Sequence, residues 1–473
     1  MQLEQKSLEA LIAAVKKLDA GFAGLPPFEV KAPGSERIAE VLGATAERLR
    51  DNFPYFHPLY AGQMLKPPHP AARLAYALAQ WINPNNHALD GGRASSAMEK
   101  EAVAEIAAMF GWQKFLGHLC GGGTMANLEA LWIASEERPG KTILASSQAH
   151  YTHSRISAVL HLPCESVACD ARGRMDMQAL AQRTARGDVG TVVATLGTTA
   201  TGSVDPLPEI LSLSQKQGFR VHVDAAYGGY FALAGNLEQA ASAAFARVAE
   251  ADSIVIDPHK HGLQPYGCGC VLFRDPAVGR FYRHDSPYTY FSSPELHLGE
   301  ISLECSRPGA AAVALWTTQK LLPLVRGGEF ARGLERGRSA ALELHDRLGA
   351  DRRFLPAFAP ELDIVVFAVR AESVSAASAL TRKIFEAAAR RGLHLAVAEL
   401  PVTFWGTNLG AMRRDRETMT CLRSVLMKPE HLEWLPRIWE ELSATAEEAL
   451  EGQKAGAAPL RQHGLRSLDQ QKI

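Results

Sequence analysis

The sequence lacks the features that mark membrane, nucleic-acid-binding and disulfide-stabilised proteins. No apolar run approaches the roughly 20 residues that a helix needs to cross a bilayer. The 50 Lys and Arg are balanced by 51 Asp and Glu, so no overall basic field draws the chain to nucleic acid or to an anionic membrane. The seven cysteines are odd in number and irregularly spaced, which favours reduced thiols in a cytoplasmic protein. We therefore expect a small-molecule ligand.

The length of 473 residues predicts more than one domain. Residues 1–70 contain helical patterns interrupted by proline-rich turns, beginning with an amphipathic helix rather than a signal peptide, and this segment is expected to pack on a neighbouring subunit. Residues 71–345 are predicted to form a large α/β domain. Residues 346–473 are predicted to form a small α+β domain with a mobile polar tail.

Short β-branched runs alternate with Ala- and Leu-rich helical stretches in the large domain, which predicts a mostly parallel sheet flanked by helices. The predicted strands span residues 141–147, 191–198, 220–226, 253–258 and 269–273. Ligands of such sheets bind beyond the carboxyl ends of the strands. Four strand ends place reactive side chains at one edge, and these are His150, Thr199, Asp224 and Lys260.

A glycine-rich turn, "CGGGTMANLEAL" at residues 120–131, precedes a helix predicted to start near Thr124. Free backbone N–H groups at the positive end of a helix dipole bind phosphate. The turn has neither the Gly-Lys-Ser/Thr of a Walker loop nor the G-x-G-x-x-G of a dinucleotide site. Glycines before a helix often form only a tight turn, so the interpretation depends on the whole set of residues.

A phosphate site, a carboxylate, a lysine and a flat partner together fit pyridoxal phosphate. Its aldehyde condenses with a lysine amine, its ring nitrogen pairs with a carboxylate, and its phosphate suits a helix N-terminus. In this sequence Lys260 would bind the aldehyde, Asp224 would pair with the ring nitrogen, and His150 would stack on the ring.

Six motifs resemble, in order and spacing, the group II pyridoxal-phosphate-dependent amino acid decarboxylases, which include aromatic amino acid, histidine and glutamate decarboxylases. The motifs are "GGGTMANLEAL", "SSQAHYTHSR", "VVATLGTTATGSVDPL", "HVDAAYGGY", "DPHKHG" and "CLRSVLMKP". The resemblance covers about residues 50–440. The most specific part is "HVDAAYGG" followed by "DPHK", with Lys260 36 positions after Asp224 (224 to 260).

The resemblance implies a fold type I homodimer with the active site at the subunit interface, and it implies decarboxylation of an L-amino acid to an amine and CO2. It assigns Lys260, Asp224 and His150 the roles given above, and it makes Ala226 the small residue under the ring. The implied cofactor contacts also include Gly123, Thr124, Met125, His259 and Thr199. Ala126 departs from the family, where many members have a serine.

The resemblance also suggests residues that act on the substrate. Tyr288 has the spacing from Lys260 of the family's mobile-loop tyrosine, which protonates the carbon after CO2 loss, and Tyr290 is a possible substitute. Arg423 resembles the arginine that faces a substrate carboxylate in glutamate-type members. Gln63, Asn85 and His87 stand where aromatic-specific members have more apolar residues. A polar or acidic substrate is therefore expected.

Several alternatives stay open at this point. His150 and His153 form an H-x-x-H pair, but no third metal ligand is evident and no metal is expected. Arg307 suits a structural role or a position near the cofactor. Another fold type I reaction, catalysed by an aldehyde synthase, a carbon–carbon lyase or an aminotransferase, would use the same residues. A non-catalytic binding role would give no reason to keep Lys260, Asp224 and His150 together.

Overall fold

A seven-stranded sheet forms the centre of the large domain. The computed structural model describes residues 4–26, 28, 34–88, 91–283 and 301–456. The strand order is β1-β7-β6-β5-β4-β2-β3, and only β7 runs antiparallel to its neighbours. The strands are β1 (Leu116–Cys120), β2 (Thr142–Ser146), β3 (Cys164–Val167), β4 (Val189–Thr195), β5 (Arg220–Asp224), β6 (Ser253–Ile256) and β7 (Gly269–Phe273). The predicted mostly parallel α/β architecture is confirmed.

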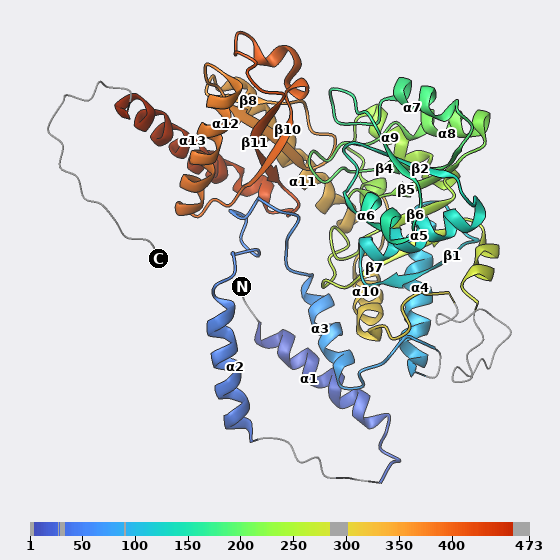
Figure 1. Cartoon of the computed structure of the whole chain (residues 1–473). Helices are drawn as coiled ribbons and strands as arrows, with labels where there is room; N and C mark the ends of the chain where they lie inside the picture. Colours follow the sequence, from blue (N-terminus) through green and yellow to red (C-terminus); the bar gives the residue numbers. More distant parts are fainter. Residues whose placement is uncertain (1–3, 27, 29–33, 89–90, 284–300, 457–473) are drawn as a thin grey trace, which may run out of the picture.

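Helices cover both faces of this sheet (Figure 1). They are α3 (Pro70–Gln80), α4 (Arg93–Met109), α5 (Gly123–Glu137), α6 (Thr152–Val159), α7 (Met177–Thr184), α8 (Leu207–Gln217), α9 (Gln239–Ala246) and α10 (Gly309–Leu321). The central strands are continuous apolar runs because both of their faces are covered. Val192, Val223 and Ile254 are fully buried in the core.

All five predicted strands of the large domain are present, whereas β1 and β3 were not predicted. The sequence of β1, LGHLC, contains a glycine and a histidine and has no β-branched residue. The strand β3 has four residues and lies at the sheet edge, where it is mostly exposed. Both strands form because a neighbouring strand offers a partner, which the local pattern does not encode.

The small domain is built on a four-stranded antiparallel sheet in the order β10-β11-β9-β8. Its elements are α11 (Glu329–Ala350), β8 (Phe354–Pro356), β9 (Ile364–Val369), α12 (Val374–Arg390), β10 (Ala396–Pro401), β11 (Thr418–Val425) and α13 (His431–Gly456). Helix α11 spans the predicted domain boundary at residue 345. The predicted boundaries at residues 70 and 345 both stay predictions. The expected mobile tail falls mainly on residues 457–473, which are outside the described residues.

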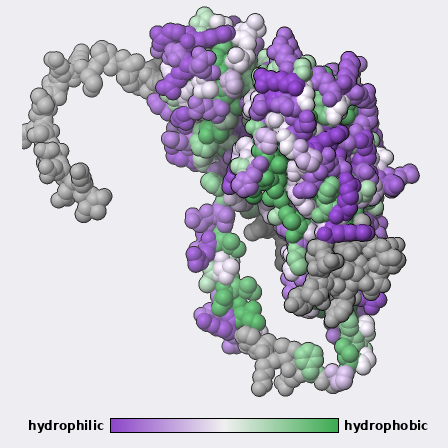
Figure 2. All heavy atoms as spheres, turned by 45° about the vertical axis from the view of Figure 1, so that its right-hand side comes forward, coloured by the Kyte–Doolittle hydropathy of each residue, from purple (hydrophilic) through white to green (hydrophobic). Residues whose placement is uncertain are grey.

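The N-terminal segment forms two helices, α1 (Gln5–Ala20) and α2 (Ser35–Leu49), that extend away from both sheets (Figure 1). The amphipathic helix predicted at the start of the chain is confirmed by α1. Neither helix has a buried residue, and apolar surface is visible on this segment in Figure 2. Among the described residues, no helix combines the length and the apolar character that crossing a bilayer requires.

Candidate active site

A cavity of about 470 Å³ lies beyond the carboxyl ends of β4, β5 and β6, next to the N-terminus of α5. The strands bring together segments that are more than 100 residues apart in the sequence. The lining residues include Gly123, Thr124, Met125, His150, Thr199, Asp224, Ala226, His259 and Lys260. Every residue for which the sequence predicted a cofactor contact therefore lines this one cavity.

Lys260 follows β6 and reaches into the cavity. Its Nζ atom lies 3.0 Å from Oδ2 of Asp257, and its side chain is 22% exposed. Asp257 is buried, and its other oxygen, Oδ1, has no hydrogen-bond partner among the described residues. Asp257 falls within the strand predicted at residues 253–258, where no role was predicted for it. In the structure this carboxylate fixes the position of the lysine amine.

Asp224 is the last residue of β5 and is almost fully buried. Its Oδ2 atom is 2.8 Å from Nε2 of His153, and its Oδ1 atom accepts the N–H of Ala226 at 3.1 Å. Burial alone would raise the pKa of Asp224. The hydrogen bond and charge interaction with His153, reinforced by His222 and Lys260, instead hold that pKa well below its usual range. The carboxylate is therefore ionised across the physiological pH range.

The structure shows how the two histidines of the H-x-x-H pair are placed. His153 is buried on α6 and is bonded to Asp224, whereas His150 lines the cavity. Burial lowers the pKa of His150, so its ring is neutral at pH 7. Its Nδ1 atom accepts the N–H of Thr152 at 3.2 Å. The two histidines thus have different surroundings, with His153 bonded to Asp224 and His150 at the cavity.

The glycine turn lets the backbone of α5 approach the strand ends closely. Gly122 has a φ of +141°, which residues with a side chain rarely adopt. A Cβ atom on Gly123 would lie 2.6 Å from Oδ2 of Asp257. The first N–H groups of α5, at Gly123, Thr124 and Met125, have no partner inside the helix. Ala126 is fully buried in a core cluster, so this position faces away from the cavity.

His259 lies beside the glycine turn, and its ring would be 3.2 Å from a Cβ atom on Gly122. Its Nδ1 atom is 2.9 Å from the carbonyl oxygen of Cys268, and burial lowers its pKa. Its Nε2 atom is 3.5 Å from Oδ2 of Asp257. Cys268 and Cys270 are buried thiols within the core, where burial raises the pKa of both.

Arg423 and Gln63 lie together beside the cavity. Arg423, on β11, donates to the carbonyl of Thr199 at 3.2 Å and to Oε1 of Gln63 at 2.6 Å. Its side chain is buried, and among the described residues no carboxylate forms an ion pair with it. Burial is the main cause of the lowered pKa of Arg423. A buried cation with only neutral partners therefore stands behind Thr199, a cavity residue.

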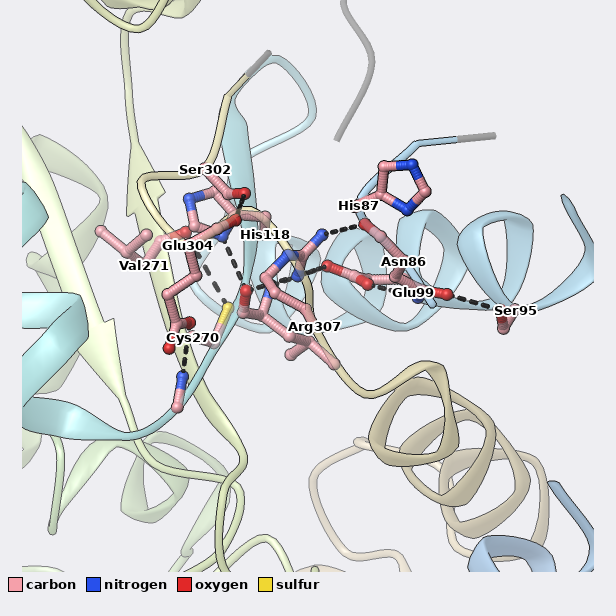
Figure 3. A network of polar contacts seen from close by, with 12 residues as sticks. Asn86, His87, Ser95, Glu99, His118, Cys270, Val271, Ser302, Glu304 and Arg307 are labelled. Carbon is pink, nitrogen blue, oxygen red and sulfur yellow. Dashed lines mark hydrogen bonds and ion pairs between the residues drawn. The ribbon is translucent and has the colours of Figure 1, made fainter. Parts of the chain in front are cut away.

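Asn85 and His87 do not line this cavity within the described chain. Oδ1 of Asn85 accepts the backbone N–H of Arg307 at 3.0 Å. Arg307 is itself buried, 2.7 Å from a carboxylate oxygen of Glu99 and 2.6 Å from the carbonyl of Leu119 (Figure 3). These contacts therefore favour a structural role for Arg307 over a position at the cofactor. Tyr288 and Tyr290 lie outside the described residues.

Comparison with known proteins agrees with this geometry. The model of the pyridoxal-dependent decarboxylase conserved domain matches residues 53–370, which is well over half of the chain. The chain belongs to the pyridoxal-dependent decarboxylase family. An L-tyrosine decarboxylase of Enterococcus faecium is 28% identical over 74% of this chain and 76% of its own.

Two further relatives extend this picture. A probable L-tyrosine/L-aspartate decarboxylase of Methanothermobacter thermautotrophicus is 28% identical over 65% of this chain and 82% of its own. The crystal structure of mouse CSAD has 22% identity and a TM-score of 0.75, covering 94% of this chain and 93% of that one. The structural match confirms the expected fold.

Pyridoxal phosphate is the cofactor of the family, and the cavity of this decarboxylase fits it. The site offers an amine, an ionised buried carboxylate and the free N-terminus of α5 within one space. Two residues that line it, Asp257 and Thr195, each have a buried side-chain oxygen (Oδ1 and Oγ1) without a hydrogen-bond partner among the described residues. Buried polar atoms without partners are costly, so they suit a polar ligand.

Sequence reasoning missed three residues of the site. Asp257 holds the lysine amine and His153 holds Asp224. Glu304 lines the cavity and accepts the backbone N–H of Gly121 at 2.9 Å (Figure 3). A carboxylate three residues before the lysine was a visible signal for Asp257. The position of Glu304 depends on tertiary packing. The H-x-x-H pair drew attention to His153, but its bond to Asp224 depends on how α6 packs against β5.

Proposed function

We propose that this decarboxylase converts an acidic L-amino acid to its amine and CO2 in the cavity around Lys260. Lys260 would hold pyridoxal phosphate covalently, with His150 against the ring and Ala226 beneath it. The phosphate would bind at Gly123, Thr124 and Met125, together with His259 and Thr199. When bound, the cofactor supplies an electron sink for the electron pair left by departing CO2. Asp224, ionised and buried, would keep a proton on the ring nitrogen.

The main support for an acidic substrate is that Arg423 has no carboxylate partner among the described residues. A departing carboxylate loses its charge as CO2, so a cation bound to it would stabilise the ground state more than the transition state. A cation is better used on a carboxylate that keeps its charge throughout the reaction. We therefore assign Arg423, supported by Gln63, to the side-chain acid of the substrate.

Changing Arg423 to glutamine tests this assignment. With L-aspartate, L-glutamate and cysteine sulfinate as substrates, we expect kcat/KM to fall about 10- to 100-fold, the value of a charge-assisted hydrogen bond. Turnover of L-tyrosine, measured in parallel by amine formation, should change little. A wild-type preference for tyrosine, or an equal loss for acidic and aromatic substrates, would contradict the assignment.

A homodimer is part of the proposal. The apolar residues Ile38, Val41, Leu42 and Leu49 of α2 are each at least 45% exposed in the single chain, which supports burial against a second copy. Asn85 and His87 would then reach the partner's cavity, and Tyr288 would act as proton donor.

The seven cysteines, all among the described residues, form no disulfide. This supports a cytoplasmic location.

The change Leu42→Glu is expected to weaken the dimer by placing a charge in the apolar contact of α2. Sedimentation of the wild-type protein should give twice the subunit mass, and the variant should dissociate at higher concentrations. Val397→Glu, on the exposed side of β10, is the matched control and should leave the dimer intact. A monomeric wild-type protein, or an equal effect of both variants, would exclude this contact.

A further inference from the structure

A second cavity, of about 710 Å³, lies between the large domain, the small domain and the segment before α3. It shares no lining residue with the cavity around Lys260. His261, which directly follows Lys260, forms part of its wall. The charged or titratable lining groups are Lys66, His69, Arg73, His261, Glu329, Arg332, Arg336, Lys428 and Glu430. An occupant would therefore lie behind the segment that carries Lys260.

Two lysines without carboxylate partners face this space. Nζ of Lys428 donates to the carbonyl oxygen of Tyr60 at 2.6 Å, and Lys428 is 5% exposed. Nζ of Lys66 donates to the carbonyl oxygen of Met427 at 3.2 Å. Among the described residues neither ammonium group forms an ion pair. Each ammonium group has three N–H donors, so donors remain for a ligand.

The other charged side chains of the cavity balance one another, so the two lysines give the cavity a net positive charge. Arg73 and Arg332 are exposed at its rim, while Arg336 is paired with Glu433. Glu329 and Glu430 are exposed carboxylates. The remaining wall is apolar and includes Phe56, Leu322, Phe330, Leu334 and Met427. The cavity thus combines two cationic groups with an apolar wall and is larger than a lone inorganic anion needs.

We infer that this cavity binds an organic anion, whose carboxylate or phosphate group is held by Lys66 and Lys428 and whose apolar body contacts Phe330 and Leu334. A bound anion compensates the ammonium groups of the buried Lys428 and the half-buried Lys66, which repel one another when both are charged. Lys and phosphate or carboxylate form charge-assisted hydrogen bonds of this kind. The site is separate from the catalytic cavity and does not depend on which amino acid is the substrate.

The protonation of the two lysines supports this inference. Burial lowers the pKa of Lys428 to about 7, with Lys66 adding repulsion, and burial lowers the pKa of Lys66 to about 8. Glu430 opposes both shifts and Asp363 opposes that of Lys66. His57 and His431 also face Lys428, and burial lowers the pKa of each. An anion stabilises the charged lysines, so its binding takes up protons and weakens as the pH rises through about 7 and 8, the pKa values of Lys428 and Lys66 in the free protein.

Calorimetric titration of the holoenzyme with benzoate, phenyl phosphate and inorganic phosphate tests the inference. The cofactor's own phosphate site is already filled in the holoenzyme. We expect saturable binding of benzoate, phenyl phosphate or both, and the comparison identifies the preferred head group. Lys66→Met and Lys428→Met should each weaken binding about 10- to 100-fold. Lys383→Met, which removes an exposed lysine on α12, is the matched control.

Two further comparisons separate this site from the catalytic one. Arg423→Gln should bind benzoate as the wild type does, even where it loses acidic substrates. Replacing a lysine with methionine keeps most of the apolar stem, and neither Lys66 nor Lys428 forms an ion pair among the described residues, so both variants should fold with unchanged cofactor content. Absence of binding by all three anions, binding of inorganic phosphate alone, or equal affinity in all variants would overturn the inference.

Discussion

Replacement of Lys260 with alanine is expected to lower kcat by at least about 10³-fold. The loss follows from the removal of the amine that lies 3.0 Å from Asp257 inside the cavity. No other lysine lines that cavity in the described chain. Amine and CO2 formation in single-turnover and steady-state assays would measure the effect. The variant should still bind pyridoxal phosphate, because Asp224 and the N-terminus of α5 remain.

A chemical control separates the lost amine from a damaged fold. Methylamine supplied in solution can enter the space left by the side chain and replace the missing primary amine. We expect it to restore part of the activity of Lys260→Ala in proportion to its concentration. Wild-type kinetics in the uncomplemented variant would rule out Lys260 as the cofactor lysine.

Replacement of Asp224 with asparagine is expected to reduce both cofactor affinity and kcat, the latter by about 10²- to 10³-fold. Asparagine keeps the shape of the side chain but has no negative charge to pair with a protonated ring nitrogen. The carboxylate is buried and ionised, so its charge interacts strongly in this site. Cofactor content by absorbance and kcat with saturating cofactor would report the two effects separately. Unchanged turnover would contradict the assignment.

Two substitutions of His153 are expected to change the pKa of Asp224 to different extents, and so test the role of its negative charge. His153→Leu removes the hydrogen bond to Oδ2 of Asp224, so the pKa of Asp224 should rise from its depressed value. Activity requires the carboxylate, and the acid limb of the pH–rate profile should therefore move to higher pH. The stability that the depressed pKa provides is present at neutral pH and is lost as the pH falls. His153→Gln, whose amide can still donate, should shift the profile less.

The strands that carry the site could be predicted from the sequence because they are buried apolar runs. The strands β4, β5 and β6 end at Thr195, Asp224 and Ile256, and the parallel order places the residues that follow at one edge. Lys260 and Asp224 were found by this argument, as was His150 after β2, whereas the glycine turn was recognised from its glycines before a predicted helix. The exact partners of these groups could not be predicted, because they depend on how α6 and the strand ends pack.

The contacts made by the small domain were the hardest to predict. Arg423 meets Gln63, although 360 residues separate them in the sequence. Asp363 binds both Nε2 of His261 at 2.8 Å and the hydroxyl of Tyr227 at 2.6 Å. These buried bonds join the small domain to the residues that follow Lys260 and Asp224. Local periodicity contains no information on such long-range pairs.

Borohydride reduction of the holoenzyme, followed by peptide mass mapping, tests the central claim most directly. Reduction makes the bond between pyridoxal phosphate and its lysine permanent, so the modified residue can be identified. The structure predicts one phosphopyridoxyl group per subunit, located on Lys260. Modification of a different lysine, such as Lys66 or Lys428 of the second cavity, or no modification in a protein that retains its cofactor, would contradict the account.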